Sequence, residues 1–316
     1  MDAAPKIAVV TGPTAAGKTA LGVMLARQLG GEIVSADAMQ VYRRMDIGTA
    51  KAAKDEMRGV PHHMIDVAEP WETYSVARYV AQADACVRDI LERGLIPIIV
   101  GGTGLYIDSL VAGRSFDGGS ADDALRAALE RKYCALGGEK LLEALAAVDP
   151  ERAARLHPAD KKRIIRALEV WHATGRTITE HDLETQKKAK RYDALVIALS
   201  FEARADLYDR IDRRAEAMEK AGLFDEVQAL LDSGVSEKCT AMQAIGYKEA
   251  ARALRGEISR REAVGLIQRE SRRYAKRQLT WLRGKPGLCW VLWQGSPDFN
   301  RGRQISTEFL LSGGLK

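Results

Sequence analysis

The feature that most constrains the fold of this chain is an eight-residue stretch near its N-terminus. Gly12-Pro13-Thr14-Ala15-Ala16-Gly17-Lys18-Thr19 follows a short apolar run, residues 6–11, and precedes leucines at helical spacing. A glycine loop between a strand and a helix lets backbone N–H groups and a helix N-terminus surround a phosphate. Lys18 adds a positive charge, and the hydroxyl of Thr19 is suited to bind Mg²⁺. The sequence therefore predicts a phosphate-binding loop at residues 12–19.

The segments that follow this loop predict an α/β fold. Apolar runs at 32–37 and 95–102 alternate with helical patterns, and this alternation is typical of a parallel sheet with helices on both faces. Ligands of such sheets bind at the carboxyl ends of the strands. We therefore expect a core like that of the P-loop NTPases, in which the loops at 12–19, 35–40 and 101–104 meet.

Between the third predicted strand and the next one, the sequence changes character. Residues 117–190 contain several amphipathic helical patterns with prolines between them, and the strand-like run LVIALSF at 195–201 comes afterwards. We expect 114–193 to be an all-helical insertion. Residues 1–113 and 194–316 would then form one discontinuous α/β core.

Composition excludes several classes of protein. The four cysteines of the 316-residue chain lie far apart, without a CxxC pair, so neither a disulfide framework nor a zinc site is expected. No apolar run reaches the length needed to span a membrane, and the N-terminus runs directly into a strand without the pattern of a signal peptide. These features predict a cytoplasmic protein with reduced thiols.

The net charge of +5 is modest, but the basic residues are concentrated. Residues 264–285 contain seven basic side chains and one acidic one, on a helix whose start is marked by a capping box of Ser259 and Glu262. A second basic cluster lies at 160–166 and a third at 187–191. Such runs are often solvated helix faces. Two basic surfaces beside a phosphate-binding loop favour a nucleic acid as the partner.

Four further side chains are candidates for chemistry. Asp37 ends the second strand, where a carboxylate could act as a metal ligand or general base, or simply cap a turn. Thr103 follows two glycines at the end of the neighbouring strand, which carries no carboxylate of the kind that phosphate-loop hydrolases use for the metal. Arg210 and Arg214 lie one helical turn apart. They could reach a diphosphate or pair with aspartates on their own helix.

Several stretches together resemble one family, the bacterial tRNA dimethylallyltransferases, also called tRNA isopentenyltransferases. The matching segments follow one another from residue 12 to residue 283. They read GPTAAGKT, IVSADAMQVYRRMDIGTAK, VPHHMIDVAEPWETYSVARY, IPIIVGGTGLYIDSL, HPADKKRIIRALEVWHATGR, LYDRIDRR, TAMQAIGYKEA and YAKRQLTWLR.

The resemblance implies transfer of a dimethylallyl group from dimethylallyl diphosphate to the exocyclic N6 amine of an adenosine. That adenosine lies on the 3′ side of the anticodon, in tRNAs that read codons beginning with U. By the same resemblance, Asp37 is the general base, Thr103 hydrogen-bonds the amine, and Arg214 binds the diphosphate. The loop 12–19 then holds the diphosphate, with Mg²⁺ on Thr19.

The resemblance also implies a monomer that binds the anticodon stem-loop of tRNA. The residues that match tRNA-contacting segments of the family are Asp37, Ala38, Met39, Gln40, Lys162, Arg163, Ile164, Ile165, Arg166, Gln243, Ala244, Ile245, Gly246, Tyr247 and Lys248. This chain departs from the family pattern at two positions, with Ala38 in place of a serine and Ala159 in place of an asparagine. Neither change removes a candidate catalytic group.

Two other functions use similar parts. An adenylate isopentenyltransferase would share the crevice chemistry but act on a free nucleotide, which needs neither the helical insertion nor the basic surfaces. A phosphate-loop kinase for a small molecule would use ATP as a phosphoryl donor. The missing carboxylate at the end of strand 95–102 and the basic helices argue against the kinase.

Overall fold

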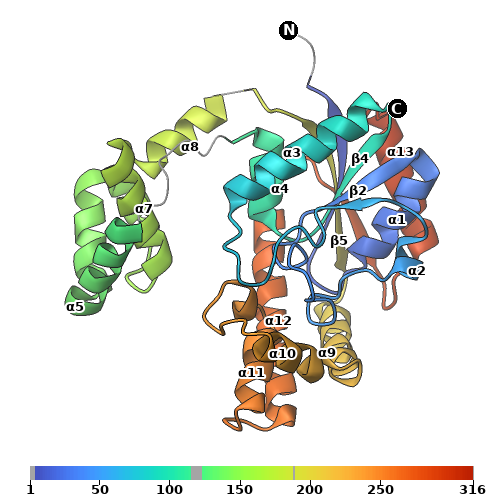
Figure 1. Cartoon of the computed structure of the whole chain (residues 1–316). Helices are drawn as coiled ribbons and strands as arrows, with labels where there is room; N and C mark the ends of the chain where they lie inside the picture. The colour runs from blue at the N-terminus through green and yellow to red at the C-terminus, as the bar shows by residue number, and fades with distance from the viewer. Residues whose placement is uncertain (1–3, 115–122, 188, 316) are drawn as a thin grey trace. The chain divides into compact units, whose positions relative to one another are not determined.

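A computed structural model of the chain describes residues 4–114, 123–187 and 189–315. The chain forms two compact units. The larger unit contains the residues up to 111 and those from 191 onward, and the smaller unit contains residues 112–190. Figure 1 shows the elements of both units along the chain.

The larger unit is built on one six-stranded sheet in which every pair of neighbouring strands is parallel. The strand order is β3-β2-β4-β1-β5-β6. The strands are β1 (Lys6–Thr11), β2 (Gly31–Ser35), β3 (His62–His63), β4 (Ile96–Val100), β5 (Asp193–Phe201) and β6 (Cys289–Trp293). The central strand β1 lies between β4 and β5, so the loop that follows it opens at the middle of the sheet's carboxyl edge.

Helices cover both faces of this sheet, as Figure 1 shows. On one face α1 (Lys18–Leu29) packs against α13 (Phe299–Ser312), and on the other α3 (Val76–Glu92) packs against β2 and β4. Because both faces are covered, both sets of alternating side chains in β1 are buried: Ile7 and Val9 as fully as Ala8 and Val10. The continuous apolar run that predicted this strand therefore reflects burial on two sides.

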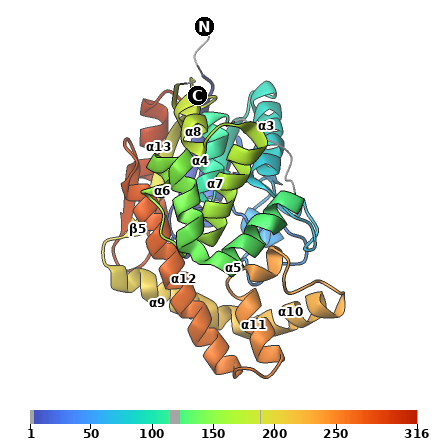
Figure 2. The same ribbon diagram turned by 90° about the vertical axis from the view of Figure 1, so that its left-hand side faces the viewer.

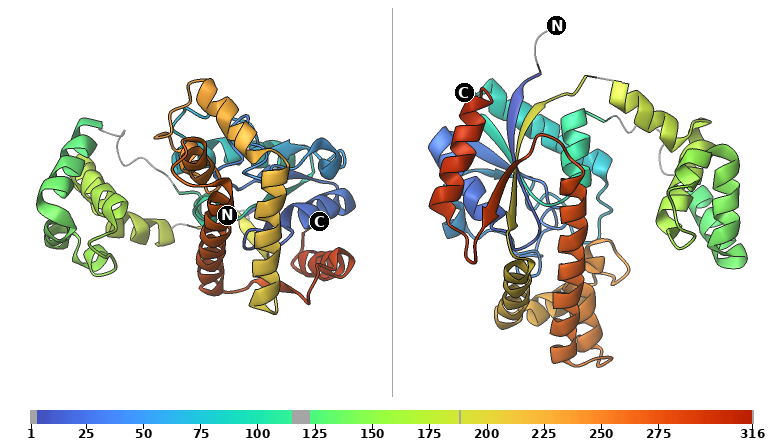
Figure 3. Two further views of the ribbon diagram at one scale, coloured as in Figure 1. Left: turned by 90° about the horizontal axis from the view of Figure 1, so that it is seen from below. Right: turned by 180° about the vertical axis from the view of Figure 1, so that it is seen from behind.

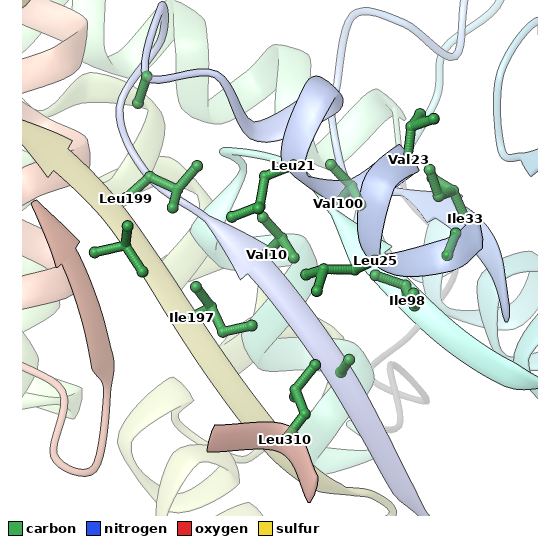
Figure 4. Packing of buried hydrophobic residues seen from close by; sticks show 14 of the residues in the cluster. Val10, Leu21, Val23, Leu25, Ile33, Ile98, Val100, Ile197, Leu199 and Leu310 are labelled. Carbon is green, nitrogen blue, oxygen red and sulfur yellow. The ribbon is translucent and has the colours of Figure 1, made fainter. Parts of the chain in front are cut away.

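The core between the sheet and the α1–α13 face is mainly aliphatic. Figure 4 shows Val10, Ile98 and Ile197 from three neighbouring strands packed against Leu25 of α1 and Leu310 of α13. All five side chains are fully buried. This packing fixes the start of α1 relative to the end of β1, and hence the shape of the loop between them.

The helices between residues 204 and 283 form a group beyond the carboxyl edge of the sheet. In the view from behind, α12 runs down from the sheet with α9 and α11 beside it (Figure 3). These helices and the remaining short helices of this unit are α2 (Lys54–Met57), α4 (Gly104–Ala112), α9 (Arg204–Lys220), α10 (Leu223–Asp232), η1 (Ala241–Gln243), α11 (Tyr247–Leu254) and α12 (Arg260–Arg283). Ser259 and Glu262 cap α12 reciprocally, as the sequence predicts.

The smaller unit contains only helices in its described residues, and Figure 2 shows them. They are α5 (Asp123–Val148), α6 (Pro150–Ala153), α7 (Lys161–Thr174) and α8 (Ile178–Lys187). The unit has its own apolar core, in which Leu145 of α5 meets Ile164 and Leu168 of α7. No helix in the described parts of the chain is long and apolar enough to cross a membrane.

The predicted fold class is confirmed: a parallel sheet with helices on both faces, and a segment of helices between β4 and β5. The predicted strands at 6–11, 32–37, 95–102 and 195–201 correspond to β1, β2, β4 and β5. The sequence patterns missed β3 and β6, the two edge strands. β3 is only two residues long. β6 does follow a turn signal, Pro286-Gly287, which the sequence reasoning did not use.

Candidate active site

The backbone between β1 and α1 has the conformation of a phosphate-binding loop. Gly12 and Gly17 have φ angles of 151° and 88°, and Ala15 has a φ of 64°. A β-carbon on Gly12 would lie 2.6 Å from the carbonyl oxygen of Leu199, so only glycine fits against the neighbouring strand there. Gly17 then caps the start of α1, whose first N–H groups face the loop.

Side chains from outside the loop hold its carbonyl groups. The carbonyl oxygen of Ala15 accepts a hydrogen bond from Arg210 Nε at 3.1 Å, and that of Ala16 accepts one from Trp293 Nε1 at 2.9 Å. Lys18 Nζ donates to the carbonyl oxygen of Pro13 at 2.8 Å. The N–H groups of Thr14 and Ala16 are bonded within the protein. Carbonyl oxygens repel an anion, so fixing them with donors favours a loop whose remaining N–H groups bind phosphate.

Lys18 and Arg214 place positive charge at this loop. Burial, together with the nearby Arg214, lowers the pKa of Lys18 to about 8, and Asp37 partly opposes that shift. Burial also lowers the pKa of Arg214, again opposed by Asp37, but a guanidinium stays charged at neutral pH. No hydrogen bond or ion pair of Arg214 is found within the described residues. Two neighbouring cations that form no ion pair within the described residues indicate an anion-binding site.

Arg210 and Arg214 of α9 do not pair with the aspartates considered as alternatives. Asp209 forms its ion pair with Arg213, and Asp206 accepts a hydrogen bond from the backbone of Gly295. Arg210 instead binds the phosphate loop. The helical spacing therefore brings Arg210 and Arg214 to the same site, one on the loop and the other beside Lys18 and Asp37.

Asp37 lies in the turn after β2. Its Oδ1 accepts hydrogen bonds from the N–H groups of Met39, at 2.9 Å, and Gln40, at 3.4 Å. The other oxygen, Oδ2, has no hydrogen-bond partner among the described residues. The turn-capping role and the general-base role, which the sequence left as alternatives, are thus compatible, because they use different oxygens.

Thr103 is joined to the Asp37 turn by two hydrogen bonds. Its N–H donates to the carbonyl oxygen of Ala36 at 3.0 Å, and its Oγ1 accepts from the N–H of Ala38 at 3.0 Å. A β-carbon on Gly101 would lie 2.2 Å from the Ala36 carbonyl oxygen, so glycine is required for this close approach. Because Oγ1 accepts from Ala38, its own proton is available for donation, either to the hydroxyl of Tyr274 or to a substrate.

Tyrosine rings surround the carboxylate of Asp37. Tyr79 and Tyr106 stack with ring centroids 3.9 Å apart, and Tyr274 of α12 interacts with Thr103 and with Gln278. Burial and the charge of Asp37 raise the pKa of Tyr274 to about 12, so its hydroxyl stays protonated. The charge of Asp37 also contributes to raising the pKa of Tyr79 and Tyr106, so all three tyrosines lie within its electrostatic reach.

A small cavity of about 40 Å³ lies beside the first turn of α1. The polar side chains that line it are Lys18, Thr19, Ser35, Asp37, Gln40 and His62. His62 Nε2 is buried without a hydrogen-bond partner in the described structure, and burial lowers the pKa of this imidazole. A neutral ring with an unpaired nitrogen indicates that a water or hydrated ion belongs in the cavity.

Two of the stretches that resemble the family, IVSADAMQVYRRMDIGTAK and TAMQAIGYKEA, meet in the larger unit. The carboxylate of Glu226 accepts hydrogen bonds from the backbone N–H groups of residues 46–48, and the hydroxyl of Tyr247 donates to it at 2.6 Å. A β-carbon on Gly48 would lie 2.4 Å from the Tyr247 ring. The side chain of Tyr247 is therefore fully buried and holds the segment after Asp37 in place.

The other residues proposed for tRNA contact differ in exposure. Met39 and Gln40 are half-buried, and Gln243 is exposed. In α7 of the smaller unit, Ile164 and Ile165 are buried in the core, so the exposed side chains of this segment are Lys162, Arg163 and Arg166. Ala244 and Tyr247 are buried. They can therefore only position neighbouring residues that contact tRNA.

Sequence reasoning did not assign a site role to Gln278 or Trp293. Gln278 is a polar residue on the apolar side of α12, which also carries Ala263, Ile267 and Trp281. A polar residue on an apolar face was a signal that could have indicated its role. Trp293 gave none, because its strand β6 was itself not predicted. Both reach the phosphate loop from the last third of the chain.

The fold and the site define a class of protein. It is a phosphate-loop protein in which a carboxylate and a hydroxyl, Asp37 and Thr103, lie at the strand ends next to the loop. The chain belongs to the IPP transferase family, whose sequence model matches residues 40–285. A second model, of the isopentenyl transferases, matches residues 5–69. The resemblance drawn from the sequence is confirmed.

Relatives with this architecture are similar over nearly the whole chain. A tRNA dimethylallyltransferase of Caldanaerobacter subterraneus is 45% identical, over 98% of this chain and 99% of its own. That of Bacillus licheniformis is 49% identical over 90% of each chain. The crystal structure of a tRNA isopentenylpyrophosphate transferase from Bacillus halodurans is 40% identical, covers 98% of this chain and 96% of its own, and superposes with a TM-score of 0.72.

Proposed function

We propose that this protein is a tRNA dimethylallyltransferase. It transfers a dimethylallyl group from dimethylallyl diphosphate to the N6 amine of the adenosine on the 3′ side of the anticodon, in tRNAs that read codons beginning with U. The observation that carries the proposal is the free carboxylate oxygen of Asp37 beside Lys18 and Arg214. A base next to an anion-binding loop suits attack by a nucleophile on a diphosphate ester. The names of the relatives support the same reaction.

The reaction breaks the allylic C–O bond and forms a C–N bond to the adenine amine. The bridging oxygen leaves with diphosphate, whose developing charge is stabilised by the loop N–H groups, Lys18 and Arg214. The amine is a weak nucleophile, because its lone pair is delocalised into the ring. Thr103 orients the amine, and Asp37 Oδ2 receives the proton that the amine loses. N6-dimethylallyladenosine and diphosphate are the products.

The residues at the start of α1 fit Mg²⁺. Thr19 lines the cavity that contains the unpaired His62 Nε2. The described residues include no group of three or more acidic, histidine or cysteine side chains that could hold a metal without a ligand. Mg²⁺ commonly binds through one or two protein oxygens, waters and substrate phosphates. When bound, the ion neutralises charge on the leaving diphosphate, and the Thr19 hydroxyl is its protein ligand.

The tRNA is bound by basic residues of both units. We propose that Lys162, Arg163 and Arg166 of α7 contact the anticodon stem-loop, with the segments 37–40 and 243–248 nearer the adenosine. The basic face of α12 adds further phosphate contacts. An adenine stacked in a loop must leave its stack to react, at a cost of a few kcal/mol. Phosphate contacts elsewhere offset that cost.

Two consequences follow for the protein as a whole. A tRNA substrate places it in the cytoplasm. The phosphate loop, the base, the hydroxyl and the arginines all come from one chain, which supports a monomeric enzyme.

Incubation with radiolabelled dimethylallyl diphosphate and an unmodified tRNA tests the proposed function. We expect label in RNA at the adenosine next to the anticodon, and none when that adenosine is replaced by guanosine. Parallel reactions with free AMP as acceptor, and with labelled ATP as donor, test the two alternatives. Prenylated AMP without prenylated tRNA, or phosphate transfer from ATP, would contradict the proposal.

A further inference from the structure

Gln278 is a buried amide that lies between two parts of the site, the phosphate loop and the loop that carries Thr103. It lies on α12, and only 6% of its surface is exposed. Its Oε1 accepts a hydrogen bond from the N–H of Thr14, in the phosphate loop, at 2.8 Å. Its Nε2 donates to the carbonyl oxygen of Gly102, the residue before Thr103, at 3.0 Å. One side chain therefore connects the loop that binds diphosphate with the loop that carries the reactive hydroxyl.

The orientation of this amide is fixed by chemistry. A backbone N–H only donates and a carbonyl oxygen only accepts, so neither bond survives if the two ends of the amide exchange. Gly102 is part of the arrangement, because a β-carbon there would lie 2.2 Å from Nε2. No other residue type fits opposite this amide without displacing it.

The helix that carries Gln278 is itself anchored to the loop on the Thr103 side. Trp281 Nε1 donates to Asp108 Oδ2 of α4 at 2.9 Å, and the Trp281 ring lies where a β-carbon on Gly104 would be, at 2.5 Å. Tyr274, one turn before Gln278, interacts with both Gln278 and Thr103. Tyr274 before Gln278 and Trp281 after it thus hold this part of α12 in place.

We propose that Gln278 is a positioning residue that sets the separation between the phosphate loop and Thr103. This inference rests on the proposed function, in which the diphosphate ester and the adenine amine must approach in line. The loop holds the first partner, Thr103 orients the second, and Gln278 is bonded to both supports. Its role is to align the reacting carbon and nitrogen and not to bind either substrate.

The test uses Gln278→Met, which keeps the length of the side chain but removes both hydrogen bonds. Gln268→Met is the matched control, because Gln268 lies on the same helix and donates to Asp212 and Glu216 of α9. For Q278M we expect kcat to fall roughly 10- to 100-fold, since small misplacements of reacting groups have effects of that size. The KM for tRNA and the affinity for pyrophosphate should change less than about threefold, and Q268M should resemble the wild type.

A second variant separates alignment from a loss of folding. Gln278→Glu keeps an acceptor for Thr14 but, when ionised, has no donor for Gly102 and places negative charge against that carbonyl oxygen. Protonation of the carboxyl restores the donor. The kcat of Q278E relative to the wild type should therefore rise as the pH falls, with the folded fraction monitored by circular dichroism at each pH.

The outcomes are distinct. If the wild type and Q268M fail to prenylate tRNA, the proposed function is wrong, and pyrophosphate binding by the variants still reports on the loop. If they succeed and Q278M has their kcat, or loses kcat only in proportion to its folded fraction, the positioning role is wrong. A pH profile of Q278E parallel to that of the wild type would overturn it as well, even if Q278M does not fold.

Discussion

The site of the larger unit and the basic segment of the smaller unit use positive charge in opposite ways. Lys18 and Arg214 are partly buried, and burial together with the charge of Arg214 lowers the pKa of Lys18. Lys162 and Arg163 of α7 are exposed, and neither forms an ion pair within the described residues. The first pair lies at the phosphate loop, shielded from much of the solvent. The second is open to solvent and to salt.

This difference predicts separate kinetic effects. Charges in a region of low dielectric interact strongly with a developing charge and are little screened by salt. Exposed charges contribute less each, and their contribution falls as salt rises. Changes in the first region should therefore affect the rate of the chemical step at any ionic strength. Changes in the second should affect the binding of tRNA, most strongly at low salt.

The largest effect is expected for Asp37→Asn. The asparagine side chain keeps an oxygen that accepts from the N–H groups of Met39 and Gln40, so the turn is preserved, but it cannot accept a proton. Loss of a general base lowers kcat by about 100- to 10,000-fold. Single-turnover prenylation measures this effect, and filter binding should show a tRNA affinity within a few-fold of the wild type.

Asp37→Ala sharpens this prediction, since it removes both the base and the cap of the turn. We expect D37A to lose thermal stability as well as activity, whereas D37N loses activity alone. Unchanged turnover of D37N would show that Asp37 is only a turn-capping residue.

A somewhat smaller effect is expected for Arg214→Ala. Removing one preorganised donor to a developing oxyanion lowers kcat by about 100- to 1,000-fold. Pyrophosphate affinity should fall as well, because the guanidinium binds the leaving group before and after reaction. Arg213→Ala is the matched control on the next residue of α9, where the guanidinium is exposed and paired with Asp209. Equal activity of the two variants would contradict the role of Arg214.

The pKa of Lys18 predicts how pyrophosphate affinity depends on pH. In the free protein the ammonium begins to lose its proton near pH 8, and a bound anion raises this pKa. Above pH 8 binding must therefore take up a proton, and affinity should fall by up to about tenfold per pH unit. Isothermal titration calorimetry in buffers of different ionisation enthalpy measures this proton uptake.

Lys18→Arg tests the same prediction, because a guanidinium keeps its charge throughout this range. The variant should bind pyrophosphate without the decrease above pH 8. In the free wild type, the unfolded chain binds more protons than the folded one between about pH 8 and the ordinary lysine pKa, so stability should rise with pH across that window. A pyrophosphate affinity of the wild type that stays constant from pH 8 to 10 would contradict the assignment.

The sequence predicted the local parts of the site better than the contacts between them. The phosphate loop and the ends of β2 and β4 follow from local patterns, and parallel topology alone predicts that they meet. Asp37 and Thr103 were found in this way. What the sequence could not show was that Asp37 divides its two oxygens between a turn and the crevice, because that depends on rotamer and turn geometry.

Contacts over long sequence separations were also missed. Trp293 and Gln278 reach the loop across more than 260 residues, and no local pattern specifies such a pairing. Tyr247 was assigned to tRNA contact by resemblance, but its burial against Gly48 gives it a structural role. A motif shared within a family thus combines residues that contact the substrate with residues that support them, and only burial separates the two groups.

The smallest effect is expected for the double variant Lys162→Ala with Arg163→Ala. If each residue contacts one phosphate, the KM for tRNA should rise about 3- to 20-fold at moderate salt, with kcat at saturating tRNA unchanged. The slope of log affinity against log salt should decrease in magnitude by about two. The matched control is Lys140→Ala with Arg155→Ala, which removes the same charge from the same unit. Those two residues pair with Glu143 and Glu151.

The control distinguishes specific contacts from net charge. If both double variants raise KM equally, the smaller unit attracts tRNA only through its overall charge, and α7 has no particular role. If the α7 variant instead has a lower kcat, its residues act in the chemical step. The proposal that exposed charge affects only tRNA binding would then be wrong. The contrast between the two regions requires that KM for tRNA increase only in the α7 variant and that this increase disappear at high salt. Only solvent-exposed charge is screened in this way.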